Sequence, residues 1–113
     1  MPCLFCQIIQ HKIPSELIYE DNQLIAFKDI NPKAPVHILI VPKKHIESIA
    51  VLEEEDQDLM GKMIYRAKFL AEEFGVAKDG YKLVFNCRKH GGQMIDHLHL
   101  HLLGGEPLGR LKI

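Results

Sequence analysis

The sequence predicts a single α+β domain in which a mostly antiparallel sheet of about five strands packs with one long and one short helix. Short apolar or alternating segments follow one another across turn residues, which is typical of antiparallel strands. One longer segment carries the apolar stripe of an amphipathic helix. The chain has 113 residues, of which 47% are hydrophobic, enough for one core and too few for two domains. We expect the domain to span residues 1–113.

The first elements follow from helical spacing and from turn residues. Apolar residues at helical spacing predict a short opening helix that stops before Pro14, which cannot donate a hydrogen bond inside a helix. Segments 17–20 and 24–27 predict two strands of a hairpin, because the intervening Asp21 and Asn22 tolerate tight turns.

The middle of the chain contains the longest helix. Segment 36–41 is apolar and β-branched, which predicts a strand that begins near His37. Over 56–74 the apolar residues recur three or four positions apart, and Gly75 offers a left-handed stop after them. Segment 81–86 predicts the next strand.

Histidine and leucine alternate over residues 97–103, the feature around which the other predictions are arranged. A period of two fits a half-buried strand, which we expect to be central in the sheet. His97, His99 and His101 would then share one face, successive members about 6.6 to 6.8 Å apart, with the leucines in the core. Buried imidazoles need hydrogen-bond partners and titrate near neutral pH, so the row indicates chemistry more than stability.

The loop before the histidines adds groups that suit an anion. Glycines such as Gly92 let backbone N–H groups approach an anion closely, and the amides of Gln93 and Asn86 can donate to phosphate oxygens. These residues predict a phosphate site in which the middle imidazole, His99, is the nucleophile. The alternative is an exposed strand whose histidines have no common purpose.

Charge and cysteine content exclude several classes of protein. Fourteen basic and 15 acidic residues give a net charge of −1, unlike the basic surface of a protein that binds nucleic-acid polymers. Three cysteines, an odd number, argue against a disulfide framework, and the start shows no basic segment followed by a long apolar one. Because the apolar runs are also too short for a membrane span, we expect a cytoplasmic protein that binds a small ligand.

The histidine motif resembles that of the histidine triad superfamily, His-φ-His-φ-His-φ-φ with φ apolar, and residues 97–103 match it without exception. Segments 27–35 and 37–46, with Gly-Gly-Gln before the triad and Leu-Gly-Gly after it, resemble the nucleoside phosphoramidase branch. The resemblance extends over nearly the whole chain. It implies a homodimer that hydrolyses adenosine 5′-monophosphoramidates and related purine nucleoside monophosphate conjugates, with no cofactor required for catalysis.

The resemblance also implies roles for individual residues. His99 would attack the α-phosphorus and become transiently nucleotidylated, after which water releases the nucleoside monophosphate. His37 and His97 would lie against this nucleophile, and Asp29 would accept hydrogen bonds from the ribose hydroxyls, although Asp29 could instead cap a turn. The groups that would hold the phosphate are His101, Asn86, Gly92 and Gln93. The residues implied around the base are Leu4, Phe5, Ile8, Ile13 and Ile30, each of which core packing would explain as well.

The chain departs from this branch in three places. Met94 stands where Ser usually follows Gly-Gly-Gln, and because a thioether cannot donate a proton we expect slower turnover with amine leaving groups. Asp96 stands before the triad, where a bulky or apolar residue is common, and it receives no role. The tail over 107–113 lacks Trp, so the preference for a leaving group is the property that the resemblance predicts least.

Cys3 and Cys6 form a Cys-x-x-Cys pair, a common half-site for tetrahedral zinc. The resemblance implies that His45 and His97 complete a structural zinc site that ties the first helix to the sheet. The alternative is a pair of free thiols.

Two further functions compete with the hydrolase. His97 and His99 could form a His-x-His pair that binds a catalytic zinc, although no third ligand is evident. The domain could also be a nucleotide-binding regulatory module in which Met94 and the altered tail have removed useful turnover.

Overall fold

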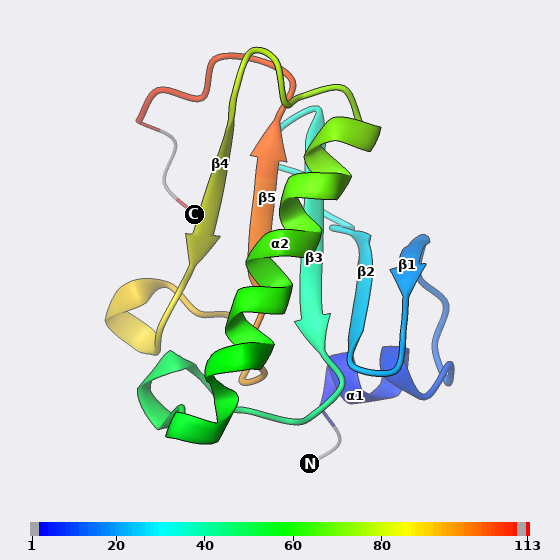
Figure 1. The fold of residues 1–113 in the computed structure, drawn as a ribbon, viewed down its shortest axis with the longest axis vertical. Helices are drawn as coiled ribbons and strands as arrows, with labels where there is room; N and C mark the ends of the chain where they lie inside the picture. The colour runs from blue at the N-terminus through cyan, green and yellow to red at the C-terminus, as the bar shows by residue number, and fades with distance from the viewer. Residues whose placement is uncertain (1–2, 111–112) are drawn as a thin grey trace.

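The computed structural model describes residues 3–110 and residue 113, so the expected domain 1–113 and the tail over 107–113 lie partly outside the described residues, as does the start of the chain. Figure 1 shows an antiparallel sheet with strand order β1-β2-β3-β5-β4, which confirms the predicted fold class. The elements are α1 (Leu4–Ile9), β1 (Leu17–Glu20), β2 (Leu24–Lys28), β3 (Val36–Pro42), α2 (Gln57–Glu73), β4 (Tyr81–Phe85) and β5 (Leu100–Gly104), with short 3₁₀ helices at Ile49–Val51, Glu54–Asp56 and Lys89–Gly91.

The two faces of the sheet bury different cores. Helix α2 crosses one face (Figure 1), where Met63 and Leu70 pack with strand residues such as Leu100 and Leu102. Helix α1 covers the other face, on which its Phe5 packs against strand residues of a second, smaller core. Alternation along each strand assigns neighbouring residues to opposite faces. Leu98, Leu100 and Leu102 of the histidine motif enter the α2 core, as predicted.

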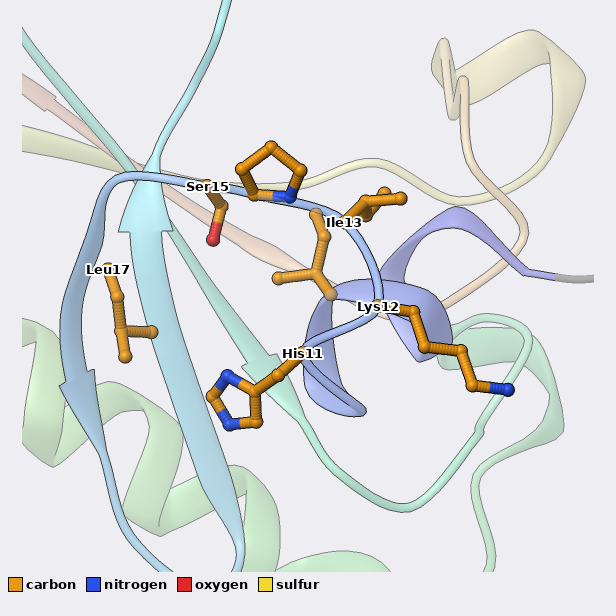
Figure 2. A pocket seen from close by; sticks show the side chains of 7 residues that line it. His11, Lys12, Ile13, Ser15 and Leu17 are labelled. Carbon is orange, nitrogen blue, oxygen red and sulfur yellow. The ribbon is translucent and has the colours of Figure 1, made fainter.

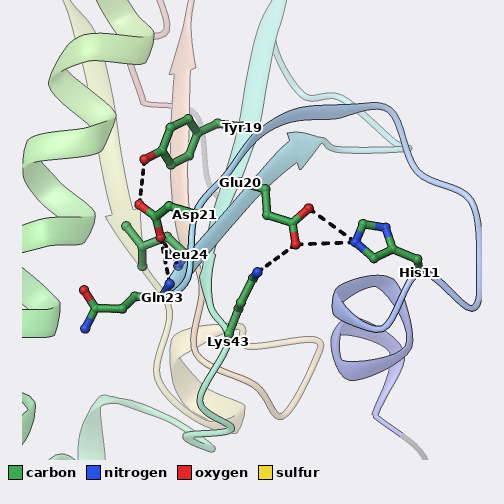
Figure 3. Close-up of polar contacts among 7 residues, drawn as sticks. All are labelled: His11, Tyr19, Glu20, Asp21, Gln23, Leu24 and Lys43. Atoms are coloured by element: carbon green, nitrogen blue, oxygen red, sulfur yellow. Dashed lines mark hydrogen bonds and ion pairs between the residues drawn. The ribbon is translucent and has the colours of Figure 1, made fainter.

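The hairpin of β1 and β2 forms at the predicted turn (Figure 3). The carboxylate of Asp21 accepts hydrogen bonds from the backbone N–H groups of Gln23 (2.7 Å) and Leu24 (2.8 Å) and from the hydroxyl of Tyr19 (2.6 Å). This is the local hydrogen bonding for which Asp is favoured in turns.

The histidine strand differs from its prediction in two respects. It begins at Leu100, so His97 and His99 precede it, and it is second from the edge because β3 occupies the centre. Its ladder with β3 runs from Val36–Gly104 to Ile40–Leu100. The next residue along β3, Val41, pairs with Ile25 of β2 and has no partner in β5. Pairing with β4 also ends at Leu100, so neither neighbour extends the strand.

Helix α2 has the predicted position and both predicted ends. A capping box joins Glu53 and Asp56 ahead of it, and the chain leaves it through Gly75, whose φ is +76°. No helix in the described part of the chain is both long and apolar enough to span a lipid bilayer.

Replacing Gly75 tests whether its conformation alone ends α2. A Cβ at this position would have no neighbour within 4 Å, so Gly75→Ala should lower the free energy of unfolding by about 1 kcal/mol through backbone strain alone. Gly75→Asn should lower it less, because Asn tolerates the left-handed region. Urea denaturation measures both changes, and equal effects of Ala and Asn would contradict this account.

Candidate active site

His99 is buried with one ring nitrogen committed and the other free. Its Nδ1 lies 2.7 Å from the backbone carbonyl oxygen of His97, so Nδ1 carries the hydrogen and donates it. Among the described residues no hydrogen bond involves its Nε2. The edge of the Phe5 ring, with centroids 5.1 Å apart, fixes the ring plane from the α1 side. The result is an oriented imidazole with a lone pair on Nε2.

His101 carries the opposite tautomer beside it, with ring centroids 4.9 Å apart. The backbone N–H of Lys33 donates to Nδ1 of His37 at 3.0 Å, so neutral His37 holds its hydrogen on Nε2. That nitrogen lies 2.9 Å from Nδ1 of His101, which must accept. His101 therefore presents an N–H at Nε2. A donor next to a free lone pair suits a group whose central atom is attacked by the neighbouring ring and whose anionic oxygen accepts the N–H.

Burial keeps these rings neutral. It is the main cause that lowers the pKa of His37, His97, His99 and His101. The pKa of His101 falls to about 4, because the charges that His99 and His37 would carry add to the effect of burial. An uncharged imidazole is the form that can attack phosphorus.

Asp29 lies next to this pair. Its Oδ1 accepts the backbone N–H of Asn31 at 2.8 Å, as a turn-capping Asp would, and its Oδ2 lies 3.4 Å from Nε2 of His37. The carboxylate is thus both part of the turn and within reach of the histidine relay.

His97 faces away from the other two histidines and into the cysteine pair. Its Nε2 donates to the carbonyl of Pro42 at 2.8 Å, which leaves the lone pair on Nδ1. That Nδ1 lies 3.3 Å from Sγ of Cys3, 3.6 Å from Sγ of Cys6 and 3.1 Å from Nδ1 of His45.

These four residues fit a tetrahedral metal. All four ligand atoms lie within 4.8 Å of one another, and Cys6 Sγ is 3.4 Å from His45 Nδ1. Zinc bond lengths give tetrahedral edges of about 3.5 Å for sulfur to nitrogen and about 3.3 Å for nitrogen to nitrogen, close to the separations in the cluster. The Pro42 carbonyl orients His97 from behind, as the outer partner of a metal-bound histidine does.

The two amides predicted to donate to phosphate are used within the loop. Nε2 of Gln93 donates to the carbonyls of Glu47 (2.7 Å) and Ile95 (2.9 Å), while Nδ2 of Asn86 donates to those of Gly91 (2.7 Å) and Ile113 (2.6 Å). Neither amide has a hydrogen left for a ligand in this arrangement. In this arrangement both amides hold the loop together, and their expected contacts to phosphate stay a prediction.

Gly92 and Met94 belong to the same loop as Gln93. Gly92 has a φ of +79°, a left-handed conformation that suits glycine, at the end of the short helix Lys89–Gly91. The side chain of Met94 is exposed to 87%, so the loop turns it outward.

The apolar residues predicted around the base divide into two groups. Phe5 and Ile8 are buried in the α1 core, whereas Leu4 is 44% and Ile30 91% exposed. Ile8 and Ile13 line a hollow of about 370 Å³ between α1 and β1 (Figure 2), with no triad histidine in its wall. The complete wall is Ile8, His11, Lys12, Ile13, Pro14, Ser15 and Leu17.

Two groups that orient the histidines escaped sequence reasoning: the N–H of Lys33 and the carbonyl of Pro42. Both are backbone atoms, so no residue-type pattern reveals them. The prolines around them gave only an indirect signal, by marking the ends of the strand between them.

The fold and the site together define a class of protein: an α+β domain in which a buried, neutral imidazole with a free lone pair lies beside an N–H donor. A family model described as "Scavenger mRNA decapping enzyme C-term binding" matches residues 2–110. A purine nucleoside phosphoramidase of Escherichia coli (strain K12) is 46% identical over 106 residues, which cover 94% of this chain and 89% of that protein.

Solved structures agree. A HIT family hydrolase from Legionella pneumophila Philadelphia 1 superposes with a TM-score of 0.96 at 46% identity, covering 99% of this chain and all of that one (100%). A HIT family hydrolase from Clostridium thermocellum gives 0.93 at 44% identity, covering 98% and 96%. The chain belongs to the histidine triad (HIT) family.

The neutral state of His101 predicts a pH-dependent stability. The unfolded chain binds a proton at this residue near pH 6.5, whereas the folded chain does so only near pH 4. Between these values the unfolded state holds more protons, so the free energy of unfolding should fall as pH falls, by up to about 3 kcal/mol from this residue. His101→Gln should flatten the curve of stability against pH measured by urea denaturation. His90→Gln, at an exposed position, should keep the wild-type slope; parallel curves for all three proteins would contradict the assignment.

Proposed function

We propose that this protein hydrolyses the P–N bond of purine nucleoside 5′-monophosphoramidates through a nucleotidyl intermediate on His99. The observation that carries the proposal is the 2.7 Å hydrogen bond from Nδ1 of His99 to the His97 carbonyl, which leaves Nε2 as a nucleophile. The 46% identity to a protein named purine nucleoside phosphoramidase supports this substrate class.

The reaction proceeds in two displacements. Nε2 of His99 attacks the α-phosphorus, a new P–N bond to the ring forms, and the bond to the amine breaks with its electrons on the amine nitrogen. The amine takes a proton from solvent, because the exposed Met94 has none to donate. Water then attacks phosphorus, gives up a proton, and releases the nucleoside monophosphate from a neutral His99. The N–H at Nε2 of His101 stabilises the phosphoryl oxygens in both steps.

The remaining contacts select the nucleotide. Oδ2 of Asp29 accepts hydrogen bonds from the ribose hydroxyls, and its position 3.4 Å from His37 places the ribose next to the relay that orients His101. The purine lies against the exposed apolar side chains at the α1 side, among which Leu4 and Ile30 are free of the core. An AMP-type nucleotide fits both contacts.

We also propose that Cys3, Cys6, His45 and His97 bind a structural zinc, which ties α1 to the sheet and takes no part in the reaction. The sulfur and nitrogen separations and the Pro42 carbonyl support it. Cysteines stay reduced in the cytosol, which supports our further proposal of a cytoplasmic location.

The geometry does not favour a catalytic zinc on His97 and His99. The described residues form two groups that could hold a metal, the four just named and Asp29 with His37 and His101, and His99 is in neither. Its Nδ1 is also committed to a backbone carbonyl. A nucleotide-binding module without turnover shares the same contacts and is separated from the enzyme by experiment.

Removing the nucleophile tests the proposed reaction. His99→Ala should lower turnover of an adenosine 5′-phosphoramidate by at least about a thousandfold, because the covalent step loses its reacting atom. Mass spectrometry of acid-quenched wild-type reactions should find one adenylyl group on His99. His90→Ala, at an exposed histidine, should keep both properties. Nucleotide binding without adduct or turnover would show a regulatory module instead.

We propose a homodimer formed by an apolar surface on α2 and β4, called here the α2–β4 patch: Ile64, Tyr65, Phe69, Tyr81 and Leu83. Each is between 37% and 60% exposed. Leu83 pairs with Leu102, a residue of the core beneath α2, so β4 shows its apolar side on the same face of the sheet as the helix. β4 is also an edge strand. Exposed apolar side chains on a helix and on an open strand edge suit a two-fold contact between copies.

Placing a charge in the α2–β4 patch tests the dimer. Tyr65→Glu should raise the dimer dissociation constant at least about tenfold, because the contact would bury an unpaired carboxylate. Leu17→Glu changes an apolar residue of similar exposure, 44%, on β1 at the opposite edge of the sheet and should leave the dimer intact. Sedimentation velocity distinguishes the two, and a wild-type monomer at all concentrations would contradict the proposal.

A further inference from the structure

The segment that carries the nucleophile is not held by the sheet. Residues 97–99 precede β5, and the backbone bond that anchors them is from the N–H of Leu98 to the carbonyl of Ile46, at 2.6 Å. Two side chains constrain the segment further: Leu98 is buried in the core beneath α2, and the ring of His97 lies against the cysteine pair. The placement of His99, which must be accurate to about 0.5 Å, therefore depends in part on how the His97 ring is fixed.

His97 joins the metal cluster to the nucleophile through two different parts of one residue. Its ring points Nδ1 at Cys3, Cys6 and His45. Its backbone carbonyl accepts the Nδ1 hydrogen of His99. A displacement of the ring out of the cluster would move the carbonyl as well, and with it the direction of the His99 lone pair.

A second route runs through α1. Phe5 lies between the two cysteines in the sequence, and its ring meets the edge of His97 at 5.9 Å and of His99 at 5.1 Å, centroid to centroid. Helix α1 has only six residues, too few to be stable without tertiary contacts. Bonds from Cys3 and Cys6 to a common metal would fix the position of Phe5 against both rings.

We propose that Cys3, Cys6 and His45 are positioning residues for the reaction: by sharing a metal with His97, they hold the carbonyl and the Phe5 ring that aim Nε2 of His99 at phosphorus. This inference rests on the function proposed above and goes beyond a purely structural zinc. Loss of the cluster should lower kcat and change KM little, because Leu4 is the one residue of α1 among the groups proposed to bind nucleotide, whereas Asp29, Ile30 and His101 lie on other segments.

The sharpest variant is His45→Ala. His45 is the exposed member of the cluster, so its removal takes away one ligand without opening a buried cavity. We expect the wild type to bind about one zinc per chain, measured by plasma mass spectrometry. In His45→Ala the zinc content should fall well below that ratio. kcat for the adenosine phosphoramidate should fall about 10- to 100-fold, the cost of a small misplacement, with KM within about twofold. The NMR signal of the His99 Nδ1–H in the ligand-free protein should broaden through exchange with water.

Two further variants make the result specific. His45→Cys supplies a thiolate for a Cys₃His set and should restore zinc, kcat and the NMR signal together. His11→Asn removes another exposed histidine and keeps a residue suited to its φ of 59°, so it should match the wild type in all readouts.

The outcomes separate this inference from the proposed function. Zinc loss in His45→Ala with unchanged kcat and an unchanged His99 signal would overturn the positioning role and leave the proposed function standing. A wild-type chain that binds no zinc when zinc is supplied would overturn it too. If the wild type neither turns over substrate nor forms an adduct, the proposed function fails, while the zinc content and the NMR signal still decide whether the cluster orients His99.

Discussion

The hydrogen bond from His99 to the backbone carbonyl of His97 is the interaction on which the chemistry of this protein depends. It selects the tautomer, directs the ring, and leaves one nitrogen available. Each other histidine is oriented by a similar fixed acceptor or donor: the Pro42 carbonyl for His97, and the Lys33 N–H for His37 and through it His101. The three identical side chains of the motif thereby differ in function: His97 has its lone pair on Nδ1, His99 has its lone pair on Nε2, and His101 presents an N–H at Nε2.

The fold supplies these partners by bringing distant segments together. β3 carries His37 and ends at Pro42, which lies 55 positions before His97 in the sequence. Its antiparallel pairing with β5 places His101 opposite Leu39, two positions from His37. α1 closes the same face with Phe5. The opposite face, beneath α2, holds the larger core and contributes stability without entering the site.

Local patterns in the sequence predicted most of the fold. The hairpin at Asp21, the extent of α2 and its end at Gly75, and the burial of the motif leucines all follow from periodicity and turn chemistry. The start of β5 did not, because the point at which its pairing with β3 and β4 ends is set by the tertiary fold and not by the alternation of histidine and leucine. The hydrogen bonds of the Asn86 and Gln93 amides to the carbonyls of Ile113 and Glu47 could not be predicted either, since these partners lie far away along the chain. The residue type shows which hydrogen bonds a side chain can donate, whereas the acceptor is determined by the folded chain.

The placement of His99 just outside the strand has an evolutionary consequence. Since the reactive ring is aimed by a short helix and one neighbouring carbonyl, a descendant could lose its chemistry through a single change in the first few residues while every strand kept its register. Such an inactive descendant would superpose well on the active protein in any comparison of the overall fold. If the positioning role proposed above holds, members of a lineage that had lost the reaction would differ first in the amino-terminal cysteines, before the histidine motif itself had changed.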